Sequence, residues 1–350
     1  MNPEYGYEPG RRVRERRRRQ RIRRRRILTA ALACLALVGA IALVSRLRAS
    51  HAPEPAAPVE EPAPPAPVEA PEETGGEEPE ETGFRLHTSA ETAALGEDVL
   101  SEYAVLIDAE SGEILAEKNS DAKMYPASMT KVLTLLVASE HMPEEDGCFT
   151  MTRAIADYCF VNKCSVVGFE VGEKIPIHEL PYGCILCSGA DASLALAELC
   201  AGSHETFTDW MNDKAAELGL SETAHFTNCV GTYDDAHCCT ARDIALILRA
   251  AMEDDFCRTI LTTPVYYSEP TEEHPDGQTL SNWFLRRIQG REAGGVAVQG
   301  GKTGYVPESG NCAASFASDE AGHAYLCVTG RSGSVWQTIN DHVLLYGMLG

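Results

Sequence analysis

The hydrophobic positions of the chain change their spacing several times, and each change predicts a different kind of segment. Ile27–Val44 contains 18 residues without a charge, which is long enough to cross a bilayer as a helix. Residues 45–83 lack a hydrophobic period and are rich in Pro, Ala and Glu from position 51 onward, which predicts an extended, disordered linker. From Phe84 to Gly350 the apolar positions follow strand and helix spacings, which predicts one globular domain.

Short runs of alternating or continuous apolar residues predict strands at both ends of this domain. Two lie early, at Tyr103–Asp108 and Glu113–Ala116, and three lie late, at Val296–Gln299, Cys312–Ala317 and Ala324–Val328. An early hairpin and a late three-strand run that rejoins it predict an antiparallel sheet of five strands, with helices packed on it.

The helical positions lie mainly between the two groups of strands. Val132–Ala138 is apolar on nearly every side, which predicts a buried helix that begins near Ser128. The middle of the domain, from Leu180 to Met252, is mostly helical in pattern, and Val335–Leu349 predicts a closing helix. The domain is therefore expected to have an α/β fold of the α+β type.

The net charge of −22 is an average over two very different parts. Residues 1–50 contain 14 Arg and three acidic residues, whereas the rest contains 16 basic and 49 acidic residues. Because basic flanks stay in the cytoplasm, we expect a cytoplasmic tail at 1–26, a single-pass membrane anchor at 27–44 and an extracellular domain at 84–350. A cleaved signal peptide is the alternative. The acidic domain offers no basic patch for a nucleic acid.

Twelve cysteines follow the predicted membrane segment. An even number permits disulfides in an exported protein, but a domain of this size does not need them. Cys184-x-x-Cys187 is the only pair at metal-like spacing, and it has no second pair. We therefore expect small buried apolar residues, with neither a metal nor another cofactor.

Ser128-x-x-Lys131 is the first motif that suggests chemistry. Three residues apart on a helix, the two side chains share one face. A desolvated lysine amine can take the serine proton and create a nucleophile. Such a short match is a weak signal alone, because many helices begin this way.

Two further motifs strengthen it. Ser188-Gly189-Ala190 follows 60 residues after Ser128 at a predicted helix start, and Lys302-Thr303-Gly304 follows after 174 residues at the end of a predicted strand. A helix cap and a strand end are their ordinary alternatives. In this order the three correspond to the motif set of penicillin-binding proteins and class A β-lactamases, in which the middle motif is Ser-Asp-Asn.

From about residue 100 to 350 the chain resembles the low-molecular-mass D-alanyl-D-alanine carboxypeptidases, which are serine-type penicillin-binding proteins. The resemblance is carried by Asp108–Leu115, Pro126–Lys131, Gly219–Asn228, Thr240–Asp243 and Gly301–Tyr305. It implies a β-lactamase/transpeptidase-like fold, with helices on both faces of the sheet and a helical subdomain.

The resemblance also implies roles for individual residues. Ser128 would attack the D-Ala-D-Ala carbonyl to form an acyl-enzyme, Lys131 would be its base, and Ser188 would pass a proton to the leaving D-alanine. For substrate binding, the implied residues are Lys302 at the terminal carboxylate, Thr303 through its hydroxyl, Gly304, and Tyr305 through a backbone N–H that completes the oxyanion hole with that of Ser128. The implied partners are peptidoglycan pentapeptides as substrate and β-lactams as inhibitors.

One position departs from the family pattern. Ala190 stands where the family usually has Asn, which weakens the expected grip on the substrate. Two alternatives therefore stay open. A catalytically silent wall-binding or penicillin-binding domain is one. A class A β-lactamase is the other, although its Glu-x-x-Leu-Asn motif is approached only by Glu217–Ser221, which lacks the Asn.

Overall fold

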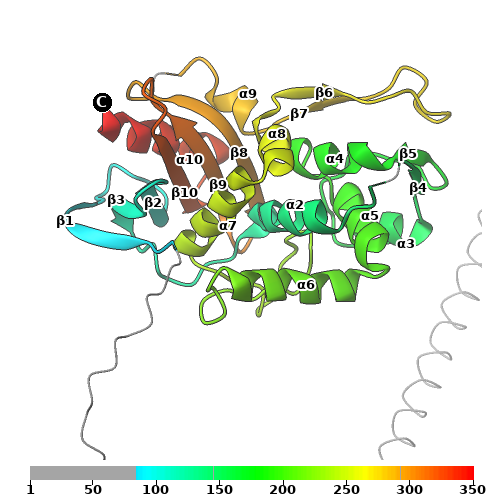
Figure 1. Cartoon of the computed structure of the whole chain (residues 1–350), viewed down its shortest axis with the longest axis horizontal. Coiled ribbons are helices and arrows are strands. Elements are labelled where there is room, and N and C mark those ends of the chain that lie inside the picture. The colour runs from blue at the N-terminus through cyan, green and yellow to red at the C-terminus, as the bar shows by residue number, and fades with distance from the viewer. Residues whose placement is uncertain (1–83, 145, 292) are drawn as a thin grey trace, which may run out of the picture. The chain divides into compact units, whose positions relative to one another are not determined.

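A computed structural model describes residues 84–350, apart from 145 and 292. A central sheet organises this part of the chain (Figure 1). In spatial order its six strands are β1 (His87–Ala94), β3 (Glu113–Lys118), β2 (Tyr103–Asp108), β10 (Ala324–Ser332), β9 (Gly310–Ser318) and β8 (Ala297–Val306). The early hairpin and the late strands are thus joined by the pairing of β2 with β10.

The prediction of five antiparallel strands was wrong at one edge. β1 adds a sixth strand, and it pairs with β3 in parallel, whereas the other neighbours in the sheet are antiparallel. Most side chains of β1 are exposed, so its sequence lacks the alternation by which strands are recognised. The Thr92 hydroxyl donates to the Ile114 carbonyl over 2.7 Å and helps to hold the strand in place.

Helices cover both faces of the sheet, as the resemblance implied. Successive residues of β2 face opposite sides. Val105 and Ile107 belong to the larger core with α2 (Thr130–His141) and α7 (Ala241–Glu253). Ala104 and Leu106 belong to a second core with α10 (Val335–Tyr346) on the other face.

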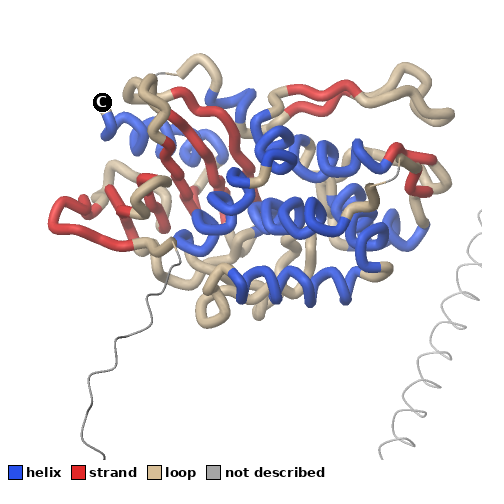
Figure 2. The backbone as a smooth tube through the Cα atoms, viewed as in Figure 1, coloured by secondary structure: helices blue, strands red, loops and turns tan. Residues whose placement is uncertain are grey.

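A mostly helical region lies beside the sheet and forms the expected helical subdomain (Figure 2). Its helices, and those that link it to the sheet, are α3 (Arg153–Val161), α4 (Leu180–Leu186), α5 (Ala190–Ala201), α6 (His204–Glu217), α8 (Asp255–Thr262) and α9 (Leu285–Ile288). The two small two-stranded sheets, β4–β5 (Cys148–Thr150, Lys174–Pro176) and β6–β7 (Val265–Tyr267, Thr279–Ser281), were not predicted. Strands of three residues are too short to show a period.

Local capping fixes where several helices begin. The Thr240 hydroxyl accepts the N–H of Asp243, and the Asp243 carboxylate accepts the N–H of Thr240, which is a reciprocal capping box at the start of α7. The side chains of Thr152, Ser203 and Ser334 each accept an N–H three residues ahead. These polar residues explain why the helical pattern starts sharply at each position.

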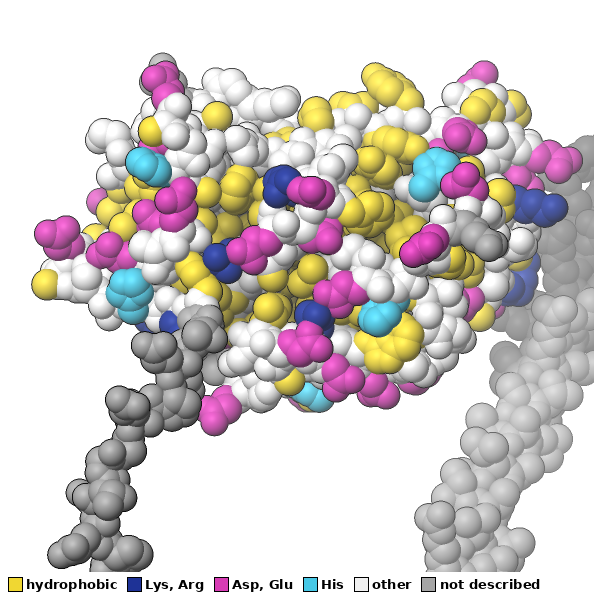
Figure 3. Space-filling model, viewed as in Figure 1, with side chains coloured by type: hydrophobic (Ala, Val, Ile, Leu, Met, Phe, Trp, Pro, Cys, Tyr) yellow, Lys and Arg dark blue, Asp and Glu magenta, His cyan; other side chains and the backbone are white. Residues whose placement is uncertain are grey.

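Acidic side chains are scattered over the face shown in Figure 3, with isolated basic ones between them. The predicted tail at 1–26, anchor at 27–44 and linker at 45–83 lie outside the described residues. Within the described part, the structure has no helix that combines the length and the apolar character needed to span a bilayer.

Candidate active site

Ser128 lies in a tight 3₁₀ turn, η1 (Ala127–Met129), which leads directly into α2. The sequence analysis placed Ser128 in the first turn of the helix, whereas α2 begins two residues later, at Thr130. The preceding residue, Ala127, has a φ of 47°, a left-handed conformation that non-glycine residues rarely adopt. This turn presents the serine at the head of a helix that is buried from Thr130 to Ala138.

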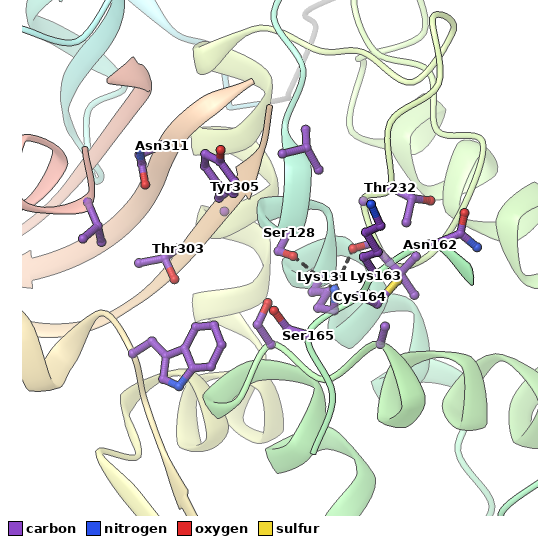
Figure 4. A pocket seen from close by; sticks show the side chains of 18 of the residues that line it. Ser128, Lys131, Asn162, Lys163, Cys164, Ser165, Thr232, Thr303, Tyr305 and Asn311 are labelled. Atoms are coloured by element: carbon purple, nitrogen blue, oxygen red, sulfur yellow. Dashed lines mark hydrogen bonds between the residues drawn. The ribbon is translucent and has the colours of Figure 1, made fainter. Parts of the chain in front are cut away.

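Lys131 meets Ser128 as the sequence spacing predicted. Its Nζ lies 3.2 Å from Ser128 Oγ and donates a second hydrogen bond, of 2.6 Å, to the carbonyl of Val230 (Figure 4). The lysine side chain is 1% exposed, and this burial lowers its pKa. A lowered pKa increases the neutral fraction of the amine, which is the form that can accept a proton from the serine.

The Val230 carbonyl is held in place by a side chain that the sequence analysis did not assign. Asn228 Oδ1 accepts three backbone N–H bonds, from Val230, Gly231 and Thr232, at 3.2, 2.7 and 3.1 Å. The loop is therefore wrapped around one buried amide. Asn228 ends a stretch that carried the family resemblance, but that stretch gave no indication of contact with Lys131.

A buried histidine, His237, links this loop to α2. His237 Nδ1 accepts the backbone N–H of Thr227 over 3.1 Å, so the proton of the neutral ring is on Nε2, which lies 2.8 Å from Thr130 Oγ1. Burial lowers the pKa of His237 to about 4. The ring is consequently neutral near pH 7 and links the loop to the residue before Lys131.

Ser188 and Lys302, which are 114 residues apart, are also brought together. Ser188 is buried between α4 and α5 with a φ of 57°. Lys302 Nζ donates to Ser188 Oγ over 2.8 Å and to the Thr303 carbonyl over 2.7 Å. Burial and the charge of Lys131 lower the pKa of Lys302 to about 7.

The strand β8 differs from its predicted length. The sequence pattern ended it at Gln299, but it continues through Lys302, Thr303 and Gly304 to Val306. A Cβ at Gly304 would come within 3.0 Å of the Ser128 nitrogen, so only glycine lets the strand approach Ser128 this closely.

These side chains meet at a cavity of about 330 Å³. Figure 4 shows Thr303, Tyr305 and Asn311 on one side of Ser128 and Asn162, Lys163 and Thr232 on the other. The further lining residues are Lys131, Cys164, Ser165, Ser188, Ala190, Val230, Gly231, Trp283, Arg287, Gly304, Val306 and Val335. Lys302 is 2% exposed and contacts the cavity lining through its hydrogen bond to Ser188 Oγ.

Ala190 lines the cavity, whereas the carboxylate of its neighbour Asp191 binds a neighbouring loop. The Asp191 carboxylate accepts the backbone N–H groups of Val167 and Gly168 at 2.9 and 3.0 Å. It fastens a neighbouring loop, so it does not replace the amide that the family pattern has at position 190.

The cysteines carry no metal cluster in the part of the chain that the structure describes, where no three possible ligands gather. All twelve cysteines of that part are free thiols. Cys184 is fully buried and lies 3.2 Å from Ser193 Oγ, whereas Cys187 is partly exposed.

A family model described as D-alanyl-D-alanine carboxypeptidase matches residues 88–332, a range that contains all three motifs. The chain belongs to this family. The family predicted from the motifs is thereby confirmed.

Curated relatives and solved structures agree with this family. The D-alanyl-D-alanine carboxypeptidase DacF of Bacillus subtilis is 30% identical over 72% of this chain and 62% of its own length. The D-alanyl-D-alanine carboxypeptidase of Streptomyces sp. strain K15 is 30% identical over 58% of this chain and 71% of its own. The chain thus spans less than two thirds of the Bacillus relative.

The solved structures share the fold over most of the described domain. The Streptomyces K15 DD-transpeptidase superposes with a TM-score of 0.64 and 27% identity, covering 71% of this chain and 97% of that one. The D-alanyl-D-alanine carboxypeptidase of Mycobacterium tuberculosis gives 0.63 and 25%, covering 75% and 96%.

Proposed function

We propose that this chain is a serine-type D-alanyl-D-alanine carboxypeptidase that removes the terminal D-alanine from peptidoglycan stem peptides. The observation that carries the proposal is the 3.2 Å contact between Ser128 Oγ and the buried amine of Lys131, at a cavity that Ser188 and Thr303 also line. A serine beside a desolvated amine is an activated nucleophile.

Acylation begins when the neutral amine of Lys131 takes the Ser128 proton and the serine oxygen attacks the carbonyl between the two D-alanines. The new C–O bond makes a tetrahedral oxyanion. The backbone N–H groups of Ser128 and Tyr305 stabilise its charge, because β8 lies against the serine turn at Gly304.

The C–N bond then breaks, and the departing D-alanine amine needs a proton. Ser188 supplies it through its hydroxyl and receives in exchange the proton that Lys131 took from Ser128, which leaves Lys131 neutral again. Lys302, which donates to Ser188 Oγ, holds that hydroxyl in position. Water then attacks the acyl carbonyl while Lys131 takes a proton from it. The bond to Ser128 Oγ breaks, the proton passes from Lys131 to that oxygen, and the shortened peptide leaves with a new carboxylate. A β-lactam opens its ring on Ser128 in the same way and remains attached.

A transfer reaction is the second candidate, since the solved Streptomyces relative is described as a DD-transpeptidase. In that reaction an amine replaces water at the acyl-enzyme and forms a new amide bond. Both reactions release D-alanine, but only the transfer yields a longer peptide when an amine acceptor is present.

The experiment compares wild type with Ser128→Ala, measuring D-alanine release from a D-Ala-D-Ala peptide and labelling by a fluorescent penicillin. Wild type should give both signals and Ser128→Ala neither. The matched control is Ser165→Ala, since Ser165 lines the same cavity and its side chain forms no hydrogen bond with Ser128 or Lys131 among the described residues; this variant should keep both signals. Release without labelling, or labelling of Ser128→Ala, contradicts the assignment.

The two open alternatives have their own outcomes. Labelling without D-alanine release indicates the silent penicillin-binding domain, for which Ala190 is the motivating departure. Rapid penicillin turnover indicates a β-lactamase.

The location follows from the sequence. The Arg-rich segment at 1–26 and the apolar segment at 27–44 support a single-pass anchor in the bacterial cell membrane, with residues 45–83 as a spacer. The domain at 84–350 would then face the wall outside the cell. Protease added to intact cells should cut within the spacer and free the domain.

A further inference from the structure

The end of helix α3 brings two cysteines together. Lys163 follows the helix with a φ of 53°, the left-handed conformation that closes a helix. Through this turn the N–H of Cys164 donates to the Cys159 carbonyl over 2.9 Å, and the N–H of Lys163 donates to the Phe160 carbonyl over 3.3 Å. These two bonds form a Schellman motif, in which the side chains at the positions of Cys159 and Cys164 pack together. The two thiols are hydrogen-bonded to each other.

The pair reaches from the core to the active-site cavity. Cys159 is 5% exposed and packs in the larger core, and it does not line the cavity. Cys164 is partly exposed and lines the cavity together with Ser128 and Lys131 (Figure 4). Both cysteines also line an adjoining pocket of about 460 Å³, so the pair has free space on that side. A small molecule that enters the active-site cavity therefore meets the thiol of Cys164.

The two thiols differ in reactivity. Their hydrogen bond lowers the pKa of Cys164, and the charge of Lys131 acts in the same direction. The same hydrogen bond raises the pKa of Cys159. Because the thiolate is the nucleophile in exchange with a disulfide, Cys164 is the attacking thiol of the pair. Cys159 lies where a second, resolving thiol is needed.

Two other cysteines lie near enough to influence the pKa of Lys131, but they are held differently. Cys184 and Cys229 are fully buried and do not line the cavity, and burial raises the pKa of both. Each is bound to Ser193, whose hydroxyl donates to Cys184 Sγ over 3.2 Å and whose carbonyl accepts from Cys229 Sγ over 3.7 Å. Neither thiol is presented to a molecule in the cavity.

We propose that Cys159 and Cys164 form a thiol-modification site that reacts with low-molecular-mass disulfides and closes to a reversible disulfide of its own. Such oxidants belong to the oxidising space outside the cell, which the domain is proposed to face. An adduct left on Cys164 would fill the cavity beside Lys131 and exclude the peptide substrate. Cys159 removes it, and the cavity is cleared. The disulfide itself stands independently of the carboxypeptidase function, whereas the protection of acylation rests on that function.

The exchange proceeds in two balanced steps. The Cys164 thiolate attacks one sulfur of the oxidant, a new S–S bond forms, and the second half of the oxidant leaves as a thiolate that takes a proton from water. The Cys159 thiol then gives up its proton and attacks Cys164 Sγ. The bond from Cys164 to the adduct breaks, and the adduct leaves as a thiol with that proton. Two protein thiols are thus oxidised while one external disulfide is reduced to two thiols.

The test treats the full-length chain with oxidised glutathione and follows two readouts. Trypsin cuts after Arg153, Lys163 and Lys174, so a disulfide between the two cysteines joins the peptides 154–163 and 164–174 in a non-reducing digest. Acylation by a chromogenic β-lactam is measured before and after treatment. Wild type should yield the joined peptides and keep its acylation rate.

Variants separate the two thiols. Cys159→Ala should carry glutathione on peptide 164–174 and lose most of its acylation, and dithiothreitol should restore it. Cys164→Ala should yield neither the joined peptides nor a loss of acylation on treatment. The matched control is Cys200→Ala, because Cys200 is also partly exposed but lies outside the cavity. It should respond as wild type does.

The other outcomes overturn the inference. Wild type that retains glutathione on Cys164 without joined peptides shows that Cys159 does not resolve the adduct. Folded Cys159→Ala that takes up no glutathione at Cys164, or that carries it and acylates at the untreated rate, refutes the site or its protective role. If Cys159→Ala does not fold, Cys159→Val decides by the same readouts. If untreated wild type is not acylated, the proposed function fails, and the joined peptides alone decide whether the dithiol site exists.

Discussion

The carbonyl oxygen of Val230 accepts a hydrogen bond of 2.6 Å from Lys131 Nζ, across 99 residues of sequence. This bond is shorter than the 3.2 Å contact of the same amine with Ser128 Oγ. The hydrogen bond to the carbonyl therefore orients the amine, so that the lone pair of the neutral amine can face Ser128 Oγ. In the proposed mechanism the backbone of the loop that carries Val230 therefore orients the base.

Asn228→Ala should slow acylation, since Asn228 holds that loop through three backbone N–H bonds. Each buried N–H left without a partner costs about 1–3 kcal/mol of stability. A shifted Val230 carbonyl should also misplace Lys131 and lower the acylation rate by about tenfold or more. Stopped-flow acylation by a chromogenic β-lactam measures the rate, and thermal unfolding measures the stability.

Asp341→Ala is the matched control for Asn228→Ala. Asp341 is buried and also accepts three bonds, from the Leu100 and Ser101 N–H groups and the Ser101 hydroxyl. It lies outside the active-site cavity. Both variants should lose stability, but only Asn228→Ala should lose acylation in its folded fraction. Equal acylation rates would show that the loop does not orient the base.

Gly231→Ala should disturb the nucleophile directly. Gly231 has a φ of 79°, and a Cβ there would come within 1.9 Å of the Ala127 carbonyl oxygen. The serine turn must shift, so acylation should fall together with stability. Gly219→Ala is the control, because Gly219 has a φ of 77° with open space around its Cβ. It carries the same backbone strain and should retain the wild-type rate, whereas a loss of similar size in both variants would contradict this account.

Lys302→Met should show a pH-dependent gain in stability. The pKa of Lys302 is about 7 in the folded chain against an ordinary value of 10.5, so the unfolded chain binds more protons between those values. The cost of burying the ammonium is thus fully present below pH 7 and fades as the pH rises toward 10.5. Relative to wild type, the variant should be most favoured at low pH.

Urea unfolding at about pH 6 and about pH 9 measures this difference. The free energy of unfolding of Lys302→Met minus that of wild type should shrink between the two conditions. Lys163→Met removes an exposed lysine and should show no such trend. A difference that is the same at both pH values would mean that Lys302 stays protonated throughout. Acylation should be impaired in Lys302→Met, because Ser188 loses its donor.

Ala190→Asn should raise the rate of acylation by peptide several-fold. Ala190 faces the cavity, and Asp191 is occupied with the loop at Val167 and Gly168. One restored hydrogen bond to the substrate contributes about 0.5–1.5 kcal/mol, which corresponds to a few- to about tenfold in rate. Pre-steady-state acylation measures the change. A variant slower than wild type would show that the pocket is adapted to the smaller side chain.

Much of this protein was determined by its sequence alone. The apolar run after Ser128 predicted the buried helix, the spacing of Lys131 predicted its contact with the serine, and the order of the three motifs predicted the family. Each of these depends on a local period or on a short motif, which a chain encodes within a few residues.

Other features were decided only by tertiary structure. The sequence of the parallel edge strand β1 lacks the alternation that would predict a strand. Strand β8 continues past its predicted end, because Gly304 lets it approach the serine turn. The Val230 carbonyl and Arg287 reach the cavity from segments that carry no catalytic motif. Such contacts join residues about a hundred or more positions from their partners. The packing of β8 against the serine turn η1 and against α9 sets such distances, because no local pattern in the chain specifies which distant residues become neighbours.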